Sequence, residues 1–259
     1  MISSKSLLKK EGNSEFGINE EFEMTKILKK FARISGMKCP FRYEMNLKNS
    51  SKATMHCQRE LEEDLWGKEW LDDETMSRWY WDSYSTSKHL FNLHSWVIGL
   101  KPKLVAEIGF GRSSFVLMRA SHQVGGRFIS VDKRDFSYLC SEAEKKSTKF
   151  LIGYSDLLWD YLQQTNQRFD FLFLDYFSDE KCDAIFCETE ISKAMQFLNL
   201  TGVIAIHDTI EKKYPISQEI YSIAEKWGLE CSTLPYNYGM SFLRRRVDSY
   251  EDYWIKKND

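Results

Sequence analysis

Five polar side chains at the ends of short apolar runs have the types and spacing to bind or transform a ligand: Glu107, Asp132, Asp175, His207 and Asp208. Glu107 lies two residues before the first glycine of a Gly-Phe-Gly-Arg-Ser-Ser run, where bare backbone can approach a ligand closely. A carboxylate at this point repels a pyrophosphate and attracts positive charge, such as an ammonium or a sulfonium. The sequence therefore favours a cationic nucleoside ligand over a dinucleotide.

These side chains need a scaffold that brings the ends of their apolar runs together. Five short runs predict buried β-strands, with helix-length segments between them, at 104–108, 127–132, 149–153, 171–175 and 202–206. In an open parallel sheet the ligand crevice lies at the carboxyl ends of the strands. The pattern predicts an α/β, Rossmann-like, mostly parallel sheet with helices on both faces. The helix after the glycine pair is expected to have Ser113 or Ser114 as its N-cap.

Residues 103–246 resemble the catalytic domain of class I S-adenosylmethionine-dependent methyltransferases, in particular the small-molecule O-methyltransferases of the catechol type and of bacterial natural-product synthesis. The runs that carry the resemblance are 107–114, 130–132, 153–156, 171–175 and 201–209, and the segment 236–244 is similar to the family's closing hairpin. The resemblance implies a seven-stranded sheet whose C-terminal strand is antiparallel. It also implies S-adenosylmethionine as the cofactor.

Carried over residue by residue, the resemblance implies a set of cofactor contacts: Glu107, Gly109, Gly111, Ser113, Ser114, Asp132, Ser155 and Asp156. In the family, the glycine motif holds the methionine and ribose portions. The acid after the second strand holds the ribose, and residues after the third strand contact the adenine. This chain departs from the common pattern after Asp175, where Tyr176-Phe177-Ser178 stands in place of a Gly-Asp-His run.

The implied reaction is methyl transfer to a small-molecule acceptor, with a hydroxyl oxygen as the expected acceptor atom. His207 is the candidate general base, because it ends a core strand at the ligand edge and its ordinary pKa is about 6.5. Asp175 is the second candidate catalytic residue. The alternative for His207 is a purely structural hydrogen bond to a neighbouring loop.

A divalent metal ion is a second possibility for the same crevice. Catechol-type relatives coordinate magnesium with an acid after the fourth strand and an acid–amide pair after the fifth, and the corresponding residues here are Asp175, His207 and Asp208. Magnesium prefers oxygen ligands, so a histidine in the middle position suits manganese or iron better. The alternative for Asp175 and Asp208 is a role as turn or cap residues.

Two other functions remain open from the sequence. A non-catalytic module could have kept the fold and the cofactor, because the run after Asp175 is altered. A nicotinamide-dependent oxidoreductase would share the sheet, but the glycine motif lacks a third glycine and carries Glu107.

The composition of the chain limits the classes of partner that we expect it to bind. The chain has 259 residues and a net charge of −2, which argues against a nucleic-acid backbone as the main partner. No apolar run is long enough for a membrane span, and the six cysteines show no CxxC pair. We expect a cytoplasmic protein with a small-molecule substrate and no nucleic-acid or membrane partner, and a homodimer is left open.

Residues 1–100 are predicted to form a helical extension or cap, and residues 101–259 the cofactor-binding domain. Helices are expected at about 19–35, 54–66 and 73–99. Several aromatic residues lie in the last two segments or between them: Trp66, Trp70, Trp79, Tyr80 and Trp81. They either pack the extension against the sheet or line a pocket for a flat, apolar substrate.

Overall fold

The computed structural model describes residues 61–82, 85–177 and 182–246, all of which belong to one compact unit spanning 49–259. The helix expected at 19–35 and the first part of the one expected at 54–66 lie outside the described residues. No helix in the described part combines the length and apolarity that a bilayer crossing requires.

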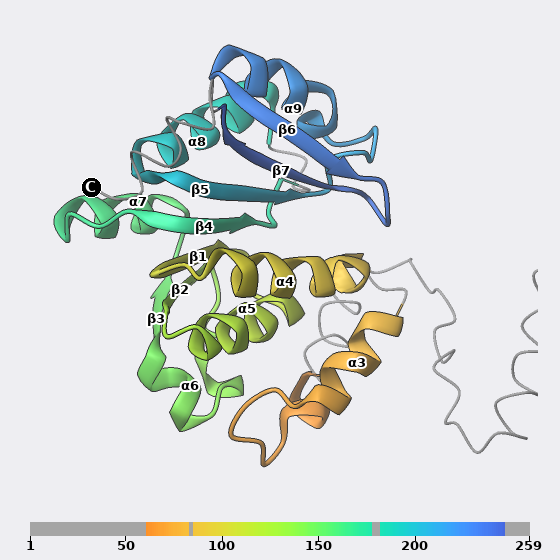
Figure 1. The fold of residues 1–259 in the computed structure, drawn as a ribbon, viewed down its shortest axis with the longest axis vertical. Helices are drawn as coiled ribbons and strands as arrows, with labels where there is room; N and C mark the ends of the chain where they lie inside the picture. Colours follow the sequence, from red (N-terminus) through yellow and green to blue (C-terminus); the bar gives the residue numbers. More distant parts are fainter. Residues whose placement is uncertain (1–60, 83–84, 178–181, 247–259) are drawn as a thin grey trace, which may run out of the picture. The chain divides into compact units, whose positions relative to one another are not determined.

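A seven-stranded sheet forms the centre of the structure (Figure 1). Its strands are β1 (Leu104–Ile108), β2 (Arg127–Asp132), β3 (Thr148–Ile152), β4 (Phe169–Leu174), β5 (Leu198–His207), β6 (Leu229–Leu234) and β7 (Met240–Arg245). The strand order is β3-β2-β1-β4-β5-β7-β6. Strands β1 to β5 are parallel, whereas β7 runs antiparallel to both of its neighbours. The predicted sheet is therefore confirmed, including its antiparallel C-terminal strand.

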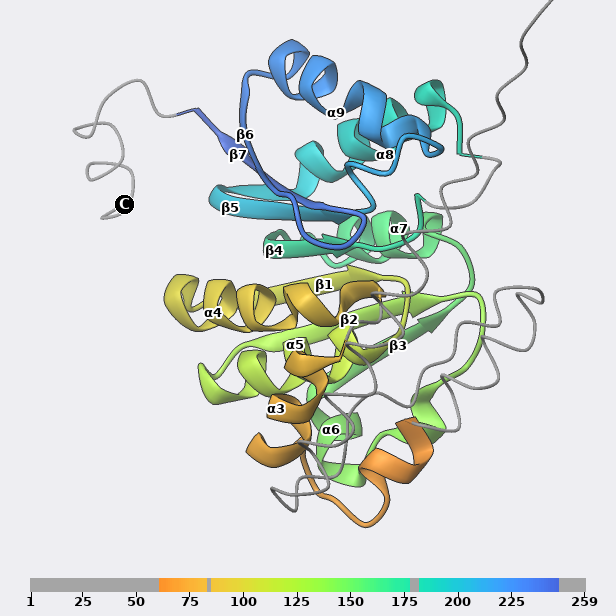
Figure 2. The same cartoon turned by 90° about the vertical axis from the view of Figure 1, so that its right-hand side faces the viewer.

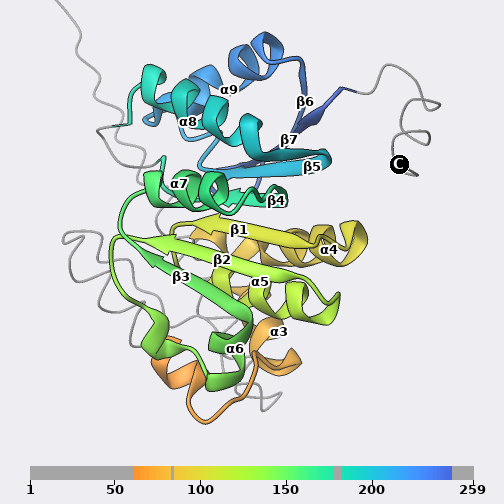
Figure 3. The same cartoon turned by 90° about the vertical axis from the view of Figure 1, so that its left-hand side faces the viewer.

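Helices cover both faces of this sheet. They are α3 (Asp73–Trp81), α4 (Leu90–Leu100), α5 (Arg112–Gln123), α6 (Glu142–Ser147), α7 (Asp156–Gln164), α8 (Ala184–Phe197) and α9 (Pro215–Lys226), with 3-10 helices η1 (Ser85–His89) and η2 (Ser137–Leu139). Helices α3, α4 and α5 pack on one face, and α7, α8 and α9 on the other. Figure 2 shows α4 and α5 in front of β1 and β2, and Figure 3 shows the same helices behind these strands.

Alternating side chains on each strand separate the two cores. On β4, Phe171 and Phe173 pack with α4 and α5, whereas Leu172 and Leu174 pack with α7, α8 and α9. All four side chains are fully buried. A strand buried on both faces has continuous apolar sequence, which is why the strands could be predicted as uninterrupted runs.

The prediction of one continuous helix at 73–99 is wrong. Helix α3 ends at Trp81, because Asp82 has extended backbone with ψ 147°, and η1 separates α3 from α4. Segment 85–87 has the sequence Ser-Thr-Ser, and hydroxyl side chains compete with helical hydrogen bonds for backbone groups. The break matters for the site, since it places η1 beside the sheet edge.

The strand order reverses between β1 and β4. Strands β2 and β3 lie beyond β1, and β5 lies beyond β4, so the connections leave these two strands in opposite directions. Ligands of open α/β sheets bind at such a switch point, outside the carboxyl ends of the strands. In this protein Gly109 follows β1 and Asp175 follows β4.

Candidate active site

The two glycines after β1 have different surroundings. Gly109 has φ +102°, and a Cβ atom built on it would lie 2.6 Å from the carbonyl oxygen of Asp175. The N–H of Asp175 donates to the carbonyl of Ile108 at 3.0 Å, so the ends of β1 and β4 are in direct contact. A Cβ on Gly111 would meet nothing within 4 Å. The first glycine is therefore required by packing, and the second borders open space.

Glu107 and the two serines of the motif form a buried group beneath this turn. The hydroxyls of Ser113 and Ser114 donate to the two carboxylate oxygens of Glu107, Ser113 at 2.6 Å. All three residues are at most 1% exposed. Burial raises the pKa of the Glu107 carboxyl well above its ordinary range, although the two hydroxyls offset part of the shift. These buried side chains thus support the turn through their hydrogen bonds, and their contact with a cofactor stays a prediction.

The N-cap of α5 differs from the prediction. Gly111 holds this position, and its N–H donates to the hydroxyl of Ser114 at 2.9 Å. Neither Ser113 nor Ser114 is the N-cap, because both lie inside the first turn of the helix with their hydroxyls bound to Glu107.

Asp132 ends β2 and fixes the glycine turn from the other side. Its carboxylate accepts from the N–H of Phe110 at 2.8 Å and from the N–H of Arg134 at 2.9 Å. The ring of Phe110 stacks on Phe136, with centroids 5.2 Å apart. The acid expected to hold a ribose is therefore partly exposed and attached to the backbone of the motif.

The residues that follow β3 differ in their contacts and in their exposure. Ser155 is the N-cap position of α7, but its side chain makes no cap hydrogen bond. The exposed Asp156 accepts from Lys193 on α8 at 2.8 Å. Tyr154 is 69% exposed, with the Lys133 ammonium 5.2 Å from its ring centroid. The structure therefore pairs Asp156 with α8 and leaves Tyr154 as the accessible aromatic group at this edge.

The altered run after β4 packs inward. The hydroxyl of Tyr176 donates to Glu190 on α8 at 2.7 Å, and Phe177 is 1% exposed within the core on that face. Burial, together with the Glu190 carboxylate, raises the pKa of Tyr176 well above its ordinary value. Tyr176 and Phe177 thus stabilise the α7–α8 side and leave Asp175 as the polar side chain at the end of β4.

Asp175, His207 and Asp208 are brought together at the ends of β4 and β5. Nδ1 of His207 lies 3.0 Å from a carboxylate oxygen of Asp175 and 3.4 Å from one of Asp208. Burial opposes the charged imidazole, but the two carboxylates outweigh it and raise the pKa of His207 above its ordinary value. The predicted clustering of these residues at one edge agrees with the structure.

The side chains of His207 and Asp175 differ in how far they are buried. The side chain of His207 has no exposed surface, whereas that of Asp175 is 24% exposed. A general base must come within hydrogen-bond reach of the proton that it removes. That His207 acts as the base stays a prediction, and Asp175 is the member of the pair whose side chain reaches the surface.

The same three residues could hold a cation. One ligand atom from each of Asp175, His207 and Asp208 can be chosen so that all lie within 4.8 Å of one another. Two carboxylates and one imidazole suit manganese, iron or zinc better than magnesium. Nδ1 of His207 is, however, within hydrogen-bond distance of Asp175, so the same geometry forms a hydrogen-bonded pair without a metal ion.

His89 is a neighbour of this site that sequence reasoning missed. It ends η1, is fully buried, and its ring centroid lies 5.5 Å from that of His207. Nε2 of His89 donates to the carbonyl oxygen of Tyr236 at 2.7 Å. Burial, with the nearby His207, lowers the pKa of His89 to about 4. No local motif marks His89, because its partners come from β5 and the β6–β7 turn.

The lowered pKa of His89 predicts a loss of stability in acid. The unfolded chain binds a proton on this ring below about pH 6.5, and the folded protein does so only near pH 4. The free energy of unfolding of the wild type should therefore fall between pH 7 and pH 4.5 by about 2 kcal/mol more than that of His89→Asn. Urea denaturation at the two pH values measures this difference, and an equal fall in both proteins would contradict it.

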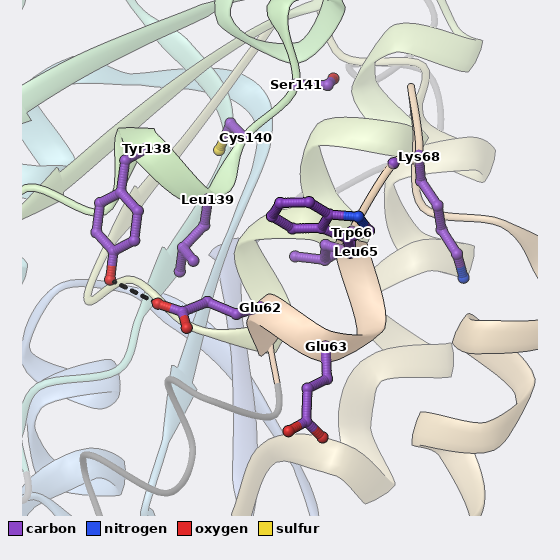
Figure 4. A pocket seen from close by; sticks show the side chains of 10 residues that line it. Glu62, Glu63, Leu65, Trp66, Lys68, Tyr138, Leu139, Cys140 and Ser141 are labelled. Atoms are coloured by element: carbon purple, nitrogen blue, oxygen red, sulfur yellow. Dashed lines mark hydrogen bonds between the residues drawn. The ribbon is translucent and has the colours of Figure 1, made fainter.

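A separate cavity of about 560 Å³ lies between residues 61–68 and the segment that includes η2 (Figure 4). Trp66, 85% exposed, and Tyr138 line it, and the Tyr138 hydroxyl is 3.5 Å from the Glu62 carboxylate. Trp79, in contrast, is buried in the core against Phe115. Trp79 thus packs the helical segment against the core, whereas a role of Trp66 in binding a flat, apolar substrate stays a prediction.

Comparisons with known proteins agree with this topology. The structure is similar to an S-adenosylhomocysteine-bound methyltransferase, PaMTH1 of Podospora anserina, with 16% identity, TM-score 0.50, and coverage of 79% of this chain and 98% of that one. It is also similar to the O-methyltransferase TomG of Streptomyces achromogenes in complex with S-adenosylmethionine, with 15% identity, TM-score 0.53, and coverage of 68% and 91%. The fold is that of S-adenosylmethionine-dependent methyltransferases. No protein-family model and no curated protein sequence matches the chain.

Asp132 provides a test of the cofactor assignment. Asp132→Asn keeps a neutral acceptor for the backbone of the glycine turn but weakens a charge-assisted bond to a ribose hydroxyl, and Asp132→Ala removes both. Because hydrogen bonds to charged groups contribute about 1.5–3 kcal/mol, we expect the alanine variant to bind S-adenosylhomocysteine at least about tenfold more weakly. The asparagine variant should fall between it and the wild type. Calorimetric titration measures the three affinities, and equal values would refute the ribose role.

Proposed function

We propose that this protein transfers a methyl group from S-adenosylmethionine to a hydroxyl oxygen of a small-molecule acceptor. The observation that carries the proposal is the contact between the glycine turn and Asp175 at the switch point of the sheet, with His207 directly behind Asp175. Two structures of similar fold, PaMTH1 and TomG, are those of methyltransferases in complex with the cofactor or its demethylated product.

The residues around the crevice fit such a cofactor. Gly111 borders open space above the turn, Asp132 offers a partly exposed carboxylate for the ribose, and Tyr154 offers an exposed ring after β3. The buried Glu107 carboxyl lies beneath the turn, where a positive charge bound above would stabilise its ionised form. When bound, S-adenosylmethionine supplies a methyl group attached to positively charged sulfur.

The protein's own contribution is to position the acceptor and take up its proton. Asp175 is partly exposed at the switch point, so its carboxylate can accept a hydrogen bond from the acceptor hydroxyl. If the methyl–sulfur bond broke as the acceptor oxygen took the methyl group, with S-adenosylhomocysteine as the leaving group, the hydroxyl proton would pass to Asp175. His207 holds the carboxylate through Nδ1 and stabilises its negative charge. Alignment of this kind contributes up to about 7–11 kcal/mol to lowering a barrier.

Binding and turnover together test the proposal. Calorimetry should detect S-adenosylhomocysteine binding and no binding of NADH, and methyl-labelled S-adenosylmethionine should transfer label to components of a metabolite extract. Binding without transfer would favour a non-catalytic cofactor-binding module. Binding of NADH alone would favour an oxidoreductase.

We further propose that the transfer does not require a metal ion, because the imidazole of His207 stands where a magnesium site prefers an oxygen ligand. Label transfer after treatment with EDTA should stay within about twofold of the untreated rate. A catalytic metal ion contributes several kcal/mol to transition-state stabilisation, so loss of a required metal would slow the transfer far more than twofold. Loss of transfer that manganese restores would overturn this point and assign Asp175, His207 and Asp208 as ligands.

A further inference from the structure

Behind Asp175, two buried imidazole rings lie edge to face. The ring centroids of His89 and His207 are 5.5 Å apart, with an interplanar angle of 71°, and both residues are at most 1% exposed. Nδ1 of His89 and Nε2 of His207 are buried and have no hydrogen-bond partner among the described residues. Because buried polar atoms are almost always hydrogen-bonded, two such nitrogens in adjacent rings indicate a shared partner.

The other nitrogen of each ring determines what this partner must be. Nε2 of His89 lies 2.7 Å from the carbonyl oxygen of Tyr236, which only accepts, so Nε2 carries the hydrogen and Nδ1 of a neutral ring accepts. Nδ1 of His207 faces the carboxylates of Asp175 and Asp208 and therefore carries a hydrogen. Nε2 of His207 then accepts when the ring is neutral and donates when it is charged.

We propose that one ordered water molecule binds both Nδ1 of His89 and Nε2 of His207, and that His89 is thereby a positioning residue for Asp175. Water has two donors and two acceptors, so it satisfies both nitrogens whichever protonation state His207 has. When both rings are neutral, an acceptor hydroxyl, with its single O–H group, cannot donate to the two nitrogens at once. Two hydrogen bonds of about 2.8–3.0 Å can bridge nitrogens as far as about 6 Å apart, and the centroids of the two rings are 5.5 Å apart.

Contacts with α5 and with the β6–β7 turn fix the position of His89. Ser87, in the same 3-10 helix, accepts from the Arg112 guanidinium at 3.1 Å, and Arg112 is the first residue of α5. His89 is bound to the β6–β7 turn through Tyr236. The helix η1 thus connects the glycine motif with the ends of β5 and β7. The functional part of the inference, that a fixed His207 keeps Asp175 oriented toward the acceptor, rests on the proposed function.

Two substitutions of His89 separate its two nitrogens. His89→Asn places an amide oxygen near the position of Nδ1 and keeps an acceptor for the water, but it loses the bond to Tyr236. His89→Gln keeps a donor for Tyr236 and loses the acceptor at Nδ1. The ¹⁵N resonances of the His207 ring in the full chain report on its Nε2 partner, and a high-resolution crystal structure of the wild type shows the water directly.

We expect a water oxygen within about 3.2 Å of both nitrogens in the wild type. The Nε2 resonance of His207 should be unchanged in His89→Asn and shifted in His89→Gln. S-adenosylhomocysteine should bind both variants with similar affinity, and label transfer should be about tenfold slower in His89→Gln than in His89→Asn.

A direct bond between the two rings, or an Nε2 resonance that moves only in His89→Asn, would overturn the water site. The wild-type measurements decide the question even if a variant fails to fold. If the wild type binds the water but transfers no methyl group, the proposed function fails and the water site stands.

Discussion

Gly109→Ala should lose at least about 3 kcal/mol in the free energy of unfolding. A non-glycine residue at φ +102° is strained by about 1–3 kcal/mol. In addition, the new methyl group would lie 2.6 Å from the carbonyl oxygen of Asp175, and the backbone of β4 cannot move away without breaking the bond from Asp175 to Ile108. Urea denaturation measures the loss, and cofactor affinity should fall with it because the ends of β1 and β4 separate.

Gly111→Ala is the matched control, two positions along the same turn. Its backbone is extended, with φ −170°, and a Cβ atom there meets no protein atom within 4 Å. Stability should therefore change by less than about 1 kcal/mol, whereas the affinity for S-adenosylhomocysteine should fall at least about tenfold if the cofactor occupies this space. Wild-type affinity in Gly111→Ala would place the cofactor elsewhere, and wild-type stability in Gly109→Ala would contradict the packing argument.

Asp175→Asn should slow methyl transfer by about 10²–10⁴-fold, the usual contribution of a positioned proton acceptor. The amide keeps the size of the side chain but cannot take up the acceptor proton. The affinity for S-adenosylhomocysteine should stay within about threefold, since an effect confined to turnover indicates a group that acts in the transition state. Transfer of label from methyl-labelled S-adenosylmethionine to a metabolite extract measures the rate.

Asp160→Asn, an exposed acid on α7, is the control for this substitution and should transfer label at the wild-type rate. If Asp175→Asn is as fast as Asp160→Asn, the proton acceptor is another group. If both the rate and the affinity collapse in Asp175→Asn, the acid serves the cofactor rather than the acceptor.

The architecture could be predicted because its signals are local. Strand β4 is buried on both faces, so the alternation of its side chains between two cores still leaves an uninterrupted apolar sequence. Polar residues at the ends of parallel strands share one edge, and for this reason Asp175, His207 and Asp208 could be expected to meet. The glycine turn was predicted from the sequence for a similar reason, since positive φ and close backbone approach favour glycine.

The direction and the partner of each side chain depended on tertiary packing. The chain separates His89 from Tyr236 by 147 positions, and only the docking of η1 against the sheet brings His89 beside His207. Tyr176 turns toward Glu190, and Asp156 toward Lys193, because α8 packs beneath them. The sequence by itself therefore determined the sheet and the residues at the carboxyl ends of its parallel strands. Only the folded structure decided that His207 is buried while Asp175 is partly exposed, because burial is set by elements that are distant in the sequence.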